Sequence, residues 1–363
     1  MKSPALITRR HWLAAAALPP LASAASAASA AGAAGAAGAA GAAGAAGAAG
    51  AAGASGASGA APASAALPSW PSRPIRLLVG FPGGSTPDLA ARVLADILTR
   101  AWGATVVVDN RPGAAGNIAA DQVAKALDDH TLGVVVNGNL TSARLLNPRL
   151  PFDPAHDFSL LSLLATAPLV LVAPTTVPGA AGFFGAARRA QARWNYGSVG
   201  IGSVGHLGME LLKHRAGFAA VHVPYNGNPA VLTALMSGQI QAALVPPGVA
   251  LPQVRAGTVQ AIGLTGGRST LAPEVAPLAS LGVAADELAV WVALVGPAGL
   301  SAAARQRLTD AVPELLRGPD ARQRFFAAGW QVQAGSPDGL RLRVRDEARI
   351  LGGIISQQGL RAE

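Results

Sequence analysis

The feature that most constrains this chain is a regular alternation of short apolar strands, loops rich in glycine, proline and asparagine, and amphipathic helices. In the first unit, an apolar strand at Ile75–Val79 runs into the loop Phe81–Asp88. The residues after that loop carry apolar side chains at helical spacing. Comparable units follow as far as Val245. Such alternation predicts an α/β fold with parallel strands covered by helices on both faces.

The units form two series, with an apolar strand at each changeover. These strands lie at Leu169–Ala173 and Val290–Val295. We therefore expect two similar α/β lobes in series. The first lobe is expected to comprise residues 71–174 and 290–363, and the second residues 175–289. Clefts between such lobes are common ligand sites.

The N-terminal segment does not have the pattern of a fold. Residues 1–24 have the layout of a secretory signal peptide, with Arg9-Arg10 before an apolar run and small residues at Ala22–Ala24. Paired arginines are typical of the twin-arginine route but also occur in Sec signals, so both routes stay open. Residues 25–69 are rich in alanine and glycine, which predicts a flexible spacer. We expect an exported, periplasmic protein.

Composition narrows the classes of function. The chain has no cysteine, which excludes a lipidated cysteine anchor, disulfides and thiol chemistry. Its 28 Lys and Arg against 19 Asp and Glu suit a small anionic ligand. Nucleic acid fits poorly, because the arginines are scattered and aromatic residues make up only 4% of the chain.

The sequence predicts no cofactor and no metal. Gly200–Gly205 spells G-x-G-x-x-G between a strand and a helix, but the next strand ends without the carboxylate that a nucleotide ribose requires. The spacing of His206, His214 and His222 is regular, yet no carboxylate or cysteine completes a zinc set. We interpret the glycines of this loop as an anion-binding turn.

The loop Phe81–Asp88 has the composition of an anion cradle. Thr86 is a natural N-cap, Pro87 suits the first helical position and Asp88 falls in the first turn. The unpaired backbone N–H groups of a helix start favour a carboxylate or a phosphate. An ordinary strand–helix junction is the alternative interpretation. Asp88 could bind a ligand or only favour the helix dipole, and both roles can coexist.

A series of motifs from Trp70 onward resembles one known family. The motifs are Trp70–Ile75, Phe81–Asp88, Val107–Asn117, Leu150–Pro154, Asn195–Ser198, His222–Gly227 and Gly296–Gly299. In this order they are similar to those of the Bug family, the extracytoplasmic solute-binding receptors of tripartite tricarboxylate transporters. The resemblance implies a type II periplasmic binding protein, a two-lobed Venus flytrap with two crossover strands.

The resemblance also implies ligand contacts from loops of both lobes, made largely by backbone N–H groups. By matching position, these are Gly84, Ser85, Thr86, Asp88, Asn137, Gly138, Ser198, Ile201, Gly202, Ser203, His206, Tyr225 and Pro246. The chain departs from the family at Val245-Pro246-Pro247, where the family has Phe-Asp-Asn. This departure removes polar groups from the expected binding rim and leaves the far end of the ligand open.

We expect a monomeric receptor rather than an enzyme, which captures a small organic acid for a membrane transporter or a sensor. Dicarboxylates, tricarboxylates, amino acids and aromatic acids all fit. One alternative is an exported α/β enzyme acting on a carboxylated substrate, with Ser198 or Ser203 as nucleophile and His206 or His222 as base. Neither serine lies in a G-x-S-x-G elbow. A non-binding interaction module is the other alternative.

Three further features are expected to be structural. The segment Asp109–Gly113 is interpreted as a turn, although Arg111 could alternatively supply charge to the cleft. Trp291, in the second crossover strand, is expected in the core or at the hinge. The charged residues of Arg341–Arg349 are expected on the solvated face of a C-terminal helix.

Overall fold

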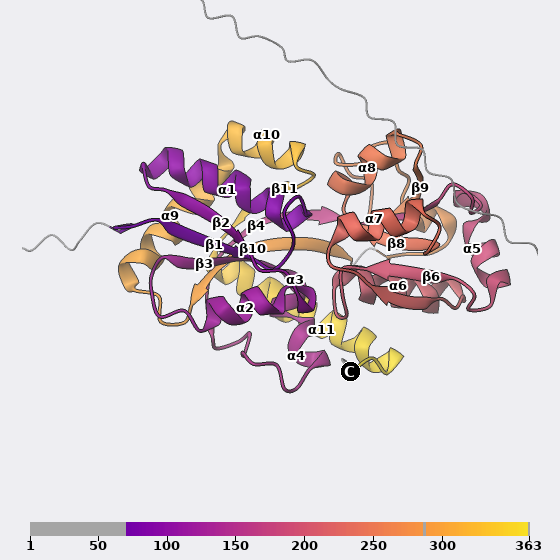
Figure 1. The fold of residues 1–363 in the computed structure, drawn as a ribbon, viewed down its shortest axis with the longest axis horizontal. Helices are drawn as coiled ribbons and strands as arrows, with labels where there is room; N and C mark the ends of the chain where they lie inside the picture. The colour runs from indigo at the N-terminus through magenta and orange to yellow at the C-terminus, as the bar shows by residue number, and fades with distance from the viewer. Residues whose placement is uncertain (1–69, 286–287, 362–363) are drawn as a thin grey trace, which may run out of the picture. The chain divides into compact units, whose positions relative to one another are not determined.

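The structure is a computed structural model that describes residues 70–285 and 288–361 (Figure 1). The signal peptide expected at 1–24 and the spacer expected at 25–69 lie outside these residues. The described chain forms two sheets with helices on both faces of each, as the alternation predicted.

The first sheet has six strands in the order β11-β4-β10-β3-β1-β2. Strand β1 pairs in parallel with β2 and β3, whereas β10 runs antiparallel to β3 and β4, and β11 antiparallel to β4. The sheet is therefore mixed rather than parallel throughout. The strands are β1 (Ile75–Val79), β2 (Val106–Asn110), β3 (Thr131–Val136), β4 (Phe158–Pro168), β10 (Ala289–Pro297) and β11 (Gln331–Gly335).

The second sheet repeats this plan with five strands in the order β7-β6-β8-β5-β9. Strand β6 pairs in parallel with β7 and β8, and β5 runs antiparallel to β8 and β9. The strands are β5 (Val170–Pro174), β6 (Asn195–Ser198), β7 (Val221–Pro224), β8 (Ala242–Val245) and β9 (Val259–Leu264). Each sheet thus places a parallel group beside an antiparallel strand at the crossover.

The changeover between the sheets differs from the expected boundary. Strand β4 lies in the first sheet and β5 in the second, with Leu169 between them. The segment 170–174, expected in the first lobe, therefore belongs to the second sheet. Strand β4 was not predicted, although its segment is rich in apolar residues. Strands β10 and β5 lie where the chain crosses between the lobes, and each runs antiparallel to the neighbouring strand of the parallel group, β3 or β8. Both sheets are therefore mixed.

Helices cover both faces of the sheets, with α1 and α10 on one side of the first sheet and α2 and α11 on the other (Figure 1). The second sheet lies between α7 and α8 on one face and α5 and α6 on the other. The helices are α1 (Thr86–Trp102), η1 (Ala114–Gly116), α2 (Asn117–Ala124), α3 (Asn137–Leu140), α4 (Ser142–Leu146), α5 (Ala180–Ala190), α6 (Val204–Ala216), α7 (Asn228–Met236), α8 (Pro247–Arg255), η2 (Leu278–Leu281), α9 (Ala302–Arg317), α10 (Pro319–Ala327) and α11 (Pro337–Gln358).

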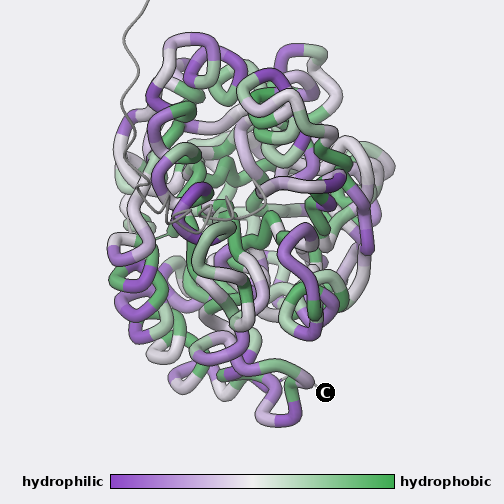
Figure 2. The backbone as a smooth tube through the Cα atoms, turned by 90° about the vertical axis from the view of Figure 1, so that its left-hand side faces the viewer, coloured by the Kyte–Doolittle hydropathy of each residue, from purple (hydrophilic) through white to green (hydrophobic). Residues whose placement is uncertain are grey.

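The central strands are buried on both faces, as their apolar runs predicted, whereas the edge strands β2, β7 and β11 are partly exposed. In β1, Leu77 packs into the cluster that contains Leu94 of α1, while Leu78 faces the cluster that contains Val123 of α2 and Trp291 of β10. Each such side chain contributes about 1.5–3 kcal/mol by leaving water. Hydrophobic segments accordingly gather inside and hydrophilic turns lie outside (Figure 2).

The parallel strands set the position of the site. The carboxyl ends of β1, β3, β6 and β8 lead into loops that begin α1, α3, α6 and α8. In open α/β sheets, ligands bind beyond the carboxyl ends of such strands, where helices begin.

Candidate ligand-binding site

Helix α1 begins one residue earlier than the sequence predicted. Ser85 is the N-cap, with extended backbone angles (φ −71°, ψ 160°), and Thr86 is the first helical residue, followed by Pro87. The Thr86 carbonyl accepts a hydrogen bond from the indole Nε1 of Trp330 (3.0 Å). Its hydroxyl accepts one from Nδ2 of Asn228 in the second lobe (3.2 Å). Thr86 is therefore held from two sides.

Ser85 has an unused hydroxyl. The residue is only 1% exposed, and its Oγ finds no hydrogen-bond partner among the described residues. It does not cap the helix with its side chain. The backbone N–H groups of Thr86 and Asp88 likewise find no acceptor in the described part of the chain. A buried hydroxyl without a partner costs about 1–3 kcal/mol, so this helix start holds a set of donors with no internal use.

Asp88 organises the loop from within. It is 0% exposed, and its carboxylate accepts hydrogen bonds from the Gly84 N–H (2.8 Å), Arg92 Nε (2.9 Å) and Asn110 Nδ2 (2.9 Å). Burial alone would raise the pKa of Asp88, but the hydrogen bonds from Arg92, Asn110 and Gly84 outweigh it, so the pKa is lowered. Asp88 is ionised and fully occupied by the protein.

Helix α6 provides a second helix start. Its N-cap Ser203 accepts a hydrogen bond from the His206 N–H (3.2 Å), and the Gly202 N–H donates to Nδ1 of His206 (3.1 Å). The N–H groups of Val204 and Gly205 have no acceptor among the described residues. Gly202 has φ +82°, and a Cβ there would lie 2.6 Å from Cδ1 of Leu146. Only glycine fits at this point.

Aromatic rings support the α6 loop from behind. The rings of His206 and His222 stack with centroids 4.1 Å apart, and Tyr196 stacks on His222 at 5.0 Å. Burial lowers the pKa of His206 to about 4, assisted by the charge of Lys213. Burial, followed by His206, lowers the pKa of His222 to about 4 as well. Both rings are neutral near pH 7, so His206 can accept the Gly202 N–H.

Glu210 completes this support. Its carboxylate accepts a hydrogen bond from the Tyr196 hydroxyl and forms an ion pair with Lys213, with Nζ 2.7 Å from Oε1. Burial and the hydrogen bond to Glu210 raise the pKa of Tyr196, so its hydroxyl remains protonated.

One contact bears on the alternative of an enzyme. Ser198 Oγ lies 2.7 Å from Nε2 of His222, which is within reach of a base. However, Ser198 is 2% exposed, and its hydroxyl also bonds the carbonyl and the N–H of Gly200 (3.0 and 3.2 Å). No carboxylate among the described residues orients the His222 ring by a hydrogen bond. The pair is a turn-stabilising contact in this geometry.

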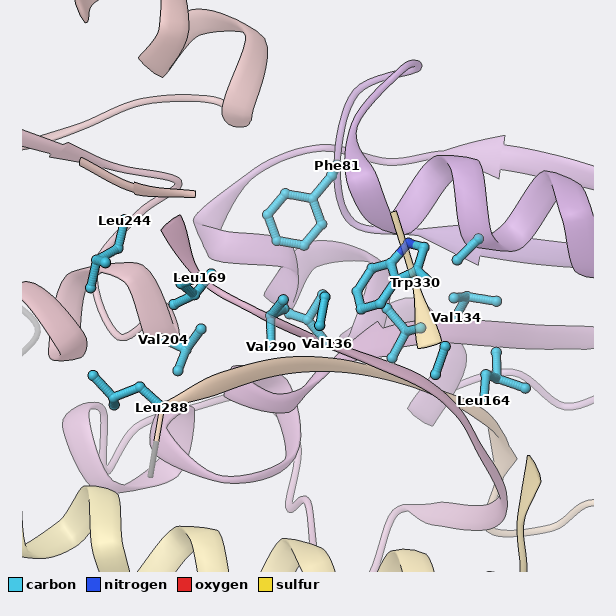
Figure 3. Packing of buried hydrophobic residues seen from close by; sticks show 14 of the residues in the cluster. Phe81, Val134, Val136, Leu164, Leu169, Val204, Leu244, Leu288, Val290 and Trp330 are labelled. Carbon is cyan, nitrogen blue, oxygen red and sulfur yellow. The ribbon is translucent and has the colours of Figure 1, made fainter. Parts of the chain in front are cut away.

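The two helix starts line one small cavity between the lobes, here called the central cavity, of about 50 Å³. None of the described residues that line it is Lys, Arg, His, Asp or Glu. The lining residues are Phe81, Ser85, Thr86, Pro87, Val136, Asn137, Leu169, Val199, Ser203, Val204, Gly205, Asn228, Leu244, Pro246 and Val290. Phe81 lies across from Val136 and Val290, with Leu169, Val204 and Leu244 on the side of the second lobe (Figure 3).

The lobes touch around this cavity. Ser142 Oγ of the first lobe donates to the Gly202 carbonyl of the second (2.6 Å), and Asn228 bonds Thr86 across the same boundary. A Cβ on Gly138 would lie 3.2 Å from that carbonyl oxygen. The lobes are therefore closed on each other at the cavity rim.

A larger hollow of about 450 Å³, here called the outer groove, lies beside the central cavity. Ala115 and Asn117 line it from the first lobe, and Ile201 and Tyr225 from the second. Val199 lines both hollows.

The structure divides the predicted site residues into four sets. Those that line the central cavity are Ser85, Thr86, Asn137, Ser203 and Pro246. Those that line the outer groove are Ile201 and Tyr225. Gly138 and Gly202 meet where the lobes touch. Neither hollow is lined by the remaining four, Gly84, Asp88, Ser198 and His206, which hold the loops in place.

Asn137 lines the central cavity but its amide is engaged. Its Nδ2 donates to Oε1 of Glu347 (2.7 Å) and to the Ala289 carbonyl (3.1 Å). Oε2 of Glu347 accepts from Nε1 of Trp291 (2.6 Å). Burial raises the pKa of Glu347. Glu347 is 5% exposed, so the expectation that the charged residues of this segment lie on the solvated face of the helix was wrong at this residue.

Among the lining residues that the prediction missed, three offer hydrogen-bond donors at helix starts. Val204 and Gly205 were missed because the helix was predicted to begin at His206, two residues late. The N-cap preference of Ser203 was the signal that could have found them. Asn228 begins α7, and only the approach of the two lobes brings it to Thr86. Arg111 pairs with Asp109 (3.0 Å), but Asp109 and Asn110 are the last residues of β2, so the predicted turn over Asp109–Gly113 was wrong at these two residues.

Within the described ranges, no group of three or more His, Asp or Glu could hold a metal ion. No helix in the same ranges is both long and apolar enough to cross a membrane.

The two sheets share one arrangement of strands, are linked by crossover strands and enclose a cavity where their helices start. This arrangement defines a two-lobed solute-binding protein. The family model of the tripartite tricarboxylate transporter family receptor, TctC, matches residues 90–360. The chain therefore belongs to this family of solute-binding receptors, as the resemblance predicted.

Relatives and solved structures agree. The chain is 32% identical to Protein BugT of Bordetella pertussis over 293 residues, covering 78% of this chain and 89% of BugT. It is similar to Rpa4515 of R. palustris, solved with adipate (29% identity, TM-score 0.77, 80% of this chain and 99% of that one). It is also similar to MatC from Rhodopseudomonas palustris, solved with malate (27%, TM-score 0.73, 79% and 100%). The predicted fold class is confirmed.

Proposed function

We propose that this protein is an extracytoplasmic receptor that captures a small carboxylate-bearing solute between its lobes. The observation that carries the proposal is the Ser85 hydroxyl, 1% exposed and without a partner among the described residues, in the wall of the central cavity. A buried donor without internal use is explained by an acceptor that arrives with the ligand.

The ligand carboxylate is held by the two helix starts. At α1 it accepts hydrogen bonds from the Ser85 hydroxyl and the Thr86 N–H, and at α6 from the N–H groups of Val204 and Gly205. Each helix start carries a partial positive charge of about half an elementary charge. The two helix starts together can therefore stabilise the carboxylate without a cationic side chain. An anion that bridges both lobes favours the closed arrangement, because it gains donors from each.

The other predicted residues have supporting roles in this proposal. Asp88 and His206 position the two loops through Gly84 and Gly202. The names of the solved relatives support the ligand class, because one was solved with adipate and another with malate. We further propose that the chain acts outside the cytoplasm, with residues 1–24 as the export signal, and delivers its solute to a transporter or a sensor.

Thermal unfolding of the purified protein with a panel of organic acids tests the proposal. A ligand should raise the melting temperature saturably, since about 100 Kd of ligand adds about 2.7 kcal/mol of stability. The matched uncharged amides should have no effect, because they lack the anion. The absence of any response to carboxylates would contradict the proposal and favour the interaction module. Turnover of a carboxylic ester or amide, abolished by Ser198→Ala, would favour the enzyme.

A further inference from the structure

We infer that the ligand is a small monocarboxylate with an apolar body, rather than a dicarboxylate or an amino acid. The inference rests on the proposed function and asks what the central cavity accepts beyond the carboxylate. Apart from the two helix starts, the wall is largely apolar. Its apolar residues are Phe81, Pro87, Val136, Leu169, Val199, Leu244, Pro246 and Val290 (Figure 3).

The amide of Asn137 is engaged elsewhere, and that of Asn228 in part. The two hydrogens on Nδ2 of Asn137 go to Glu347 and to the Ala289 carbonyl. Nδ2 of Asn228 donates one hydrogen to the Thr86 hydroxyl. A second carboxylate on the ligand would find no cation among the described lining residues and only the remaining hydrogens of neutral groups, those of Asn228, Thr86 and Ser203. A second buried charge is therefore poorly compensated.

An ammonium group on the ligand would also lack a partner. No Asp or Glu stands among the described residues that line the cavity. Two buried carboxyl groups outside the lining are already occupied, Asp88 by Gly84 and Arg92, and Glu347 by Asn137 and Trp291. A buried charge without a partner is strongly disfavoured, so an amino acid fits poorly.

Pro246 distinguishes this wall. It is the N-cap of α8, Pro247 is the first helical residue, and neither has an N–H to donate. The next residue, Gly248, packs so closely on Gly329 that a Cβ there would lie 3.0 Å from the Gly329 Cα. Helix α8 therefore offers the cavity no N–H from its N-cap or its first helical residue, and Gly248 is not among the described residues that line the cavity.

The volume limits the length of the body. About 50 Å³ is room for about three to five water-sized spheres. A carboxylate with a short, branched aliphatic body fits inside this space better than a long chain or an aromatic ring, and a longer body would have to extend past Val199 into the outer groove.

Calorimetric titration of the purified full chain with three probes of one carbon skeleton tests the inference. Isovalerate carries only the carboxylate, methylsuccinate replaces one methyl with a second carboxylate, and valine adds an ammonium group. We expect isovalerate to bind about 100-fold more tightly than either of the others, since each adds an unpartnered charge. Equal or tighter binding of methylsuccinate, malate, adipate or valine would overturn the inference and leave the proposed function standing. Failure of all carboxylates to bind would overturn both.

A pair of variants locates the selectivity. Pro246→Asn restores an N–H and adds an amide at a position where asparagine is a favoured N-cap. We expect it to improve methylsuccinate binding relative to isovalerate by about 10-fold, which is one added hydrogen bond to a charged group. Pro319→Asn makes the same change at the exposed start of α10, outside the cavity wall, and should leave the ratio unchanged. An unchanged ratio in Pro246→Asn would remove Pro246 as the determinant and overturn its role.

Discussion

Substitution of Ser85 by alanine separates a ligand donor from a structural cap. In most helices an N-cap serine bonds an N–H of the first turn, and its loss costs about 1 kcal/mol. Ser85 makes no such bond, and its hydroxyl is buried at 1% exposure without a described partner. Ser85→Ala therefore removes a buried hydroxyl without breaking a hydrogen bond among the described residues.

The magnitude follows from this geometry. Without ligand, Ser85→Ala should raise the free energy of unfolding by about 1 kcal/mol, at the lower end of the cost of an unpaired buried hydroxyl. For a protein of this size, that is about 2 °C in the melting temperature. With ligand, the lost hydrogen bond to a carboxylate is worth about 1.5–3 kcal/mol, which weakens Kd about 10- to 150-fold.

Urea unfolding and calorimetric titration measure the two effects, and Ser301→Ala is the matched control. Ser301 is the N-cap of α9, and its hydroxyl accepts from the Ala304 N–H (3.3 Å). Its loss should cost about 1 kcal/mol of stability and leave Kd unchanged. If Ser85→Ala were as destabilising as Ser301→Ala and bound ligand normally, the reasoning about its hydroxyl would be refuted.

Three further predictions concern closure and pH. Ser142→Ala removes the bond to the Gly202 carbonyl between the lobes and should weaken Kd about 3- to 10-fold by calorimetry; an unchanged Kd would show that the bond is irrelevant to closure. The lowered pKa of Asp88 gives stability that is present above its ordinary value of 3.8 and is lost as the pH falls through the lowered pKa. Asp88→Asn should thus cost about 1.5–3 kcal/mol in urea unfolding at pH 7, and the cost should shrink toward about pH 3; a cost independent of pH would contradict the assignment. His206 and His222 have pKa values of about 4 in the fold against 6.5 as free side chains, so the unfolded chain binds more protons between these values. Stability should fall by about 1–3 kcal/mol per histidine as the pH drops from about 6.5 to 4, and His222→Gln should remove about half of that loss; an undiminished loss would place the effect elsewhere.

Most of the order of strands and helices could be predicted from local pattern, although β4 and β11 were missed. The strand at 75–79 has the predicted bounds. Other errors lie at helix starts. Helix α6 begins two residues before the predicted start, and the N-cap of α1 lies one residue before the predicted N-cap. Serine and threonine are both good N-caps, so adjacent Ser85 and Thr86 compete, and local propensity does not choose between them.

The candidate site could be predicted only in part. The glycine-rich loops at Gly83–Thr86 and Gly200–Gly205 were found because their composition suits helix starts near an anion. Asn228 gave no such signal, because it meets Thr86 only through the approach of the two lobes. Glu347 resembled its charged neighbours on the helix, yet hydrogen bonds from Asn137 and Trp291 compensate its burial.

By itself, the sequence determined the alternating elements, the two series of them and the helix starts that suit a carboxylate, because these depend on neighbours along the chain. The tertiary structure alone decided which donors remain free. It bound Asp88 to Gly84 and Arg92, left the hydroxyl of Ser85 without a described partner, and closed an apolar wall around it. Whether a polar group serves the fold or a ligand depends on the groups that folding brings to it from distant parts of the chain.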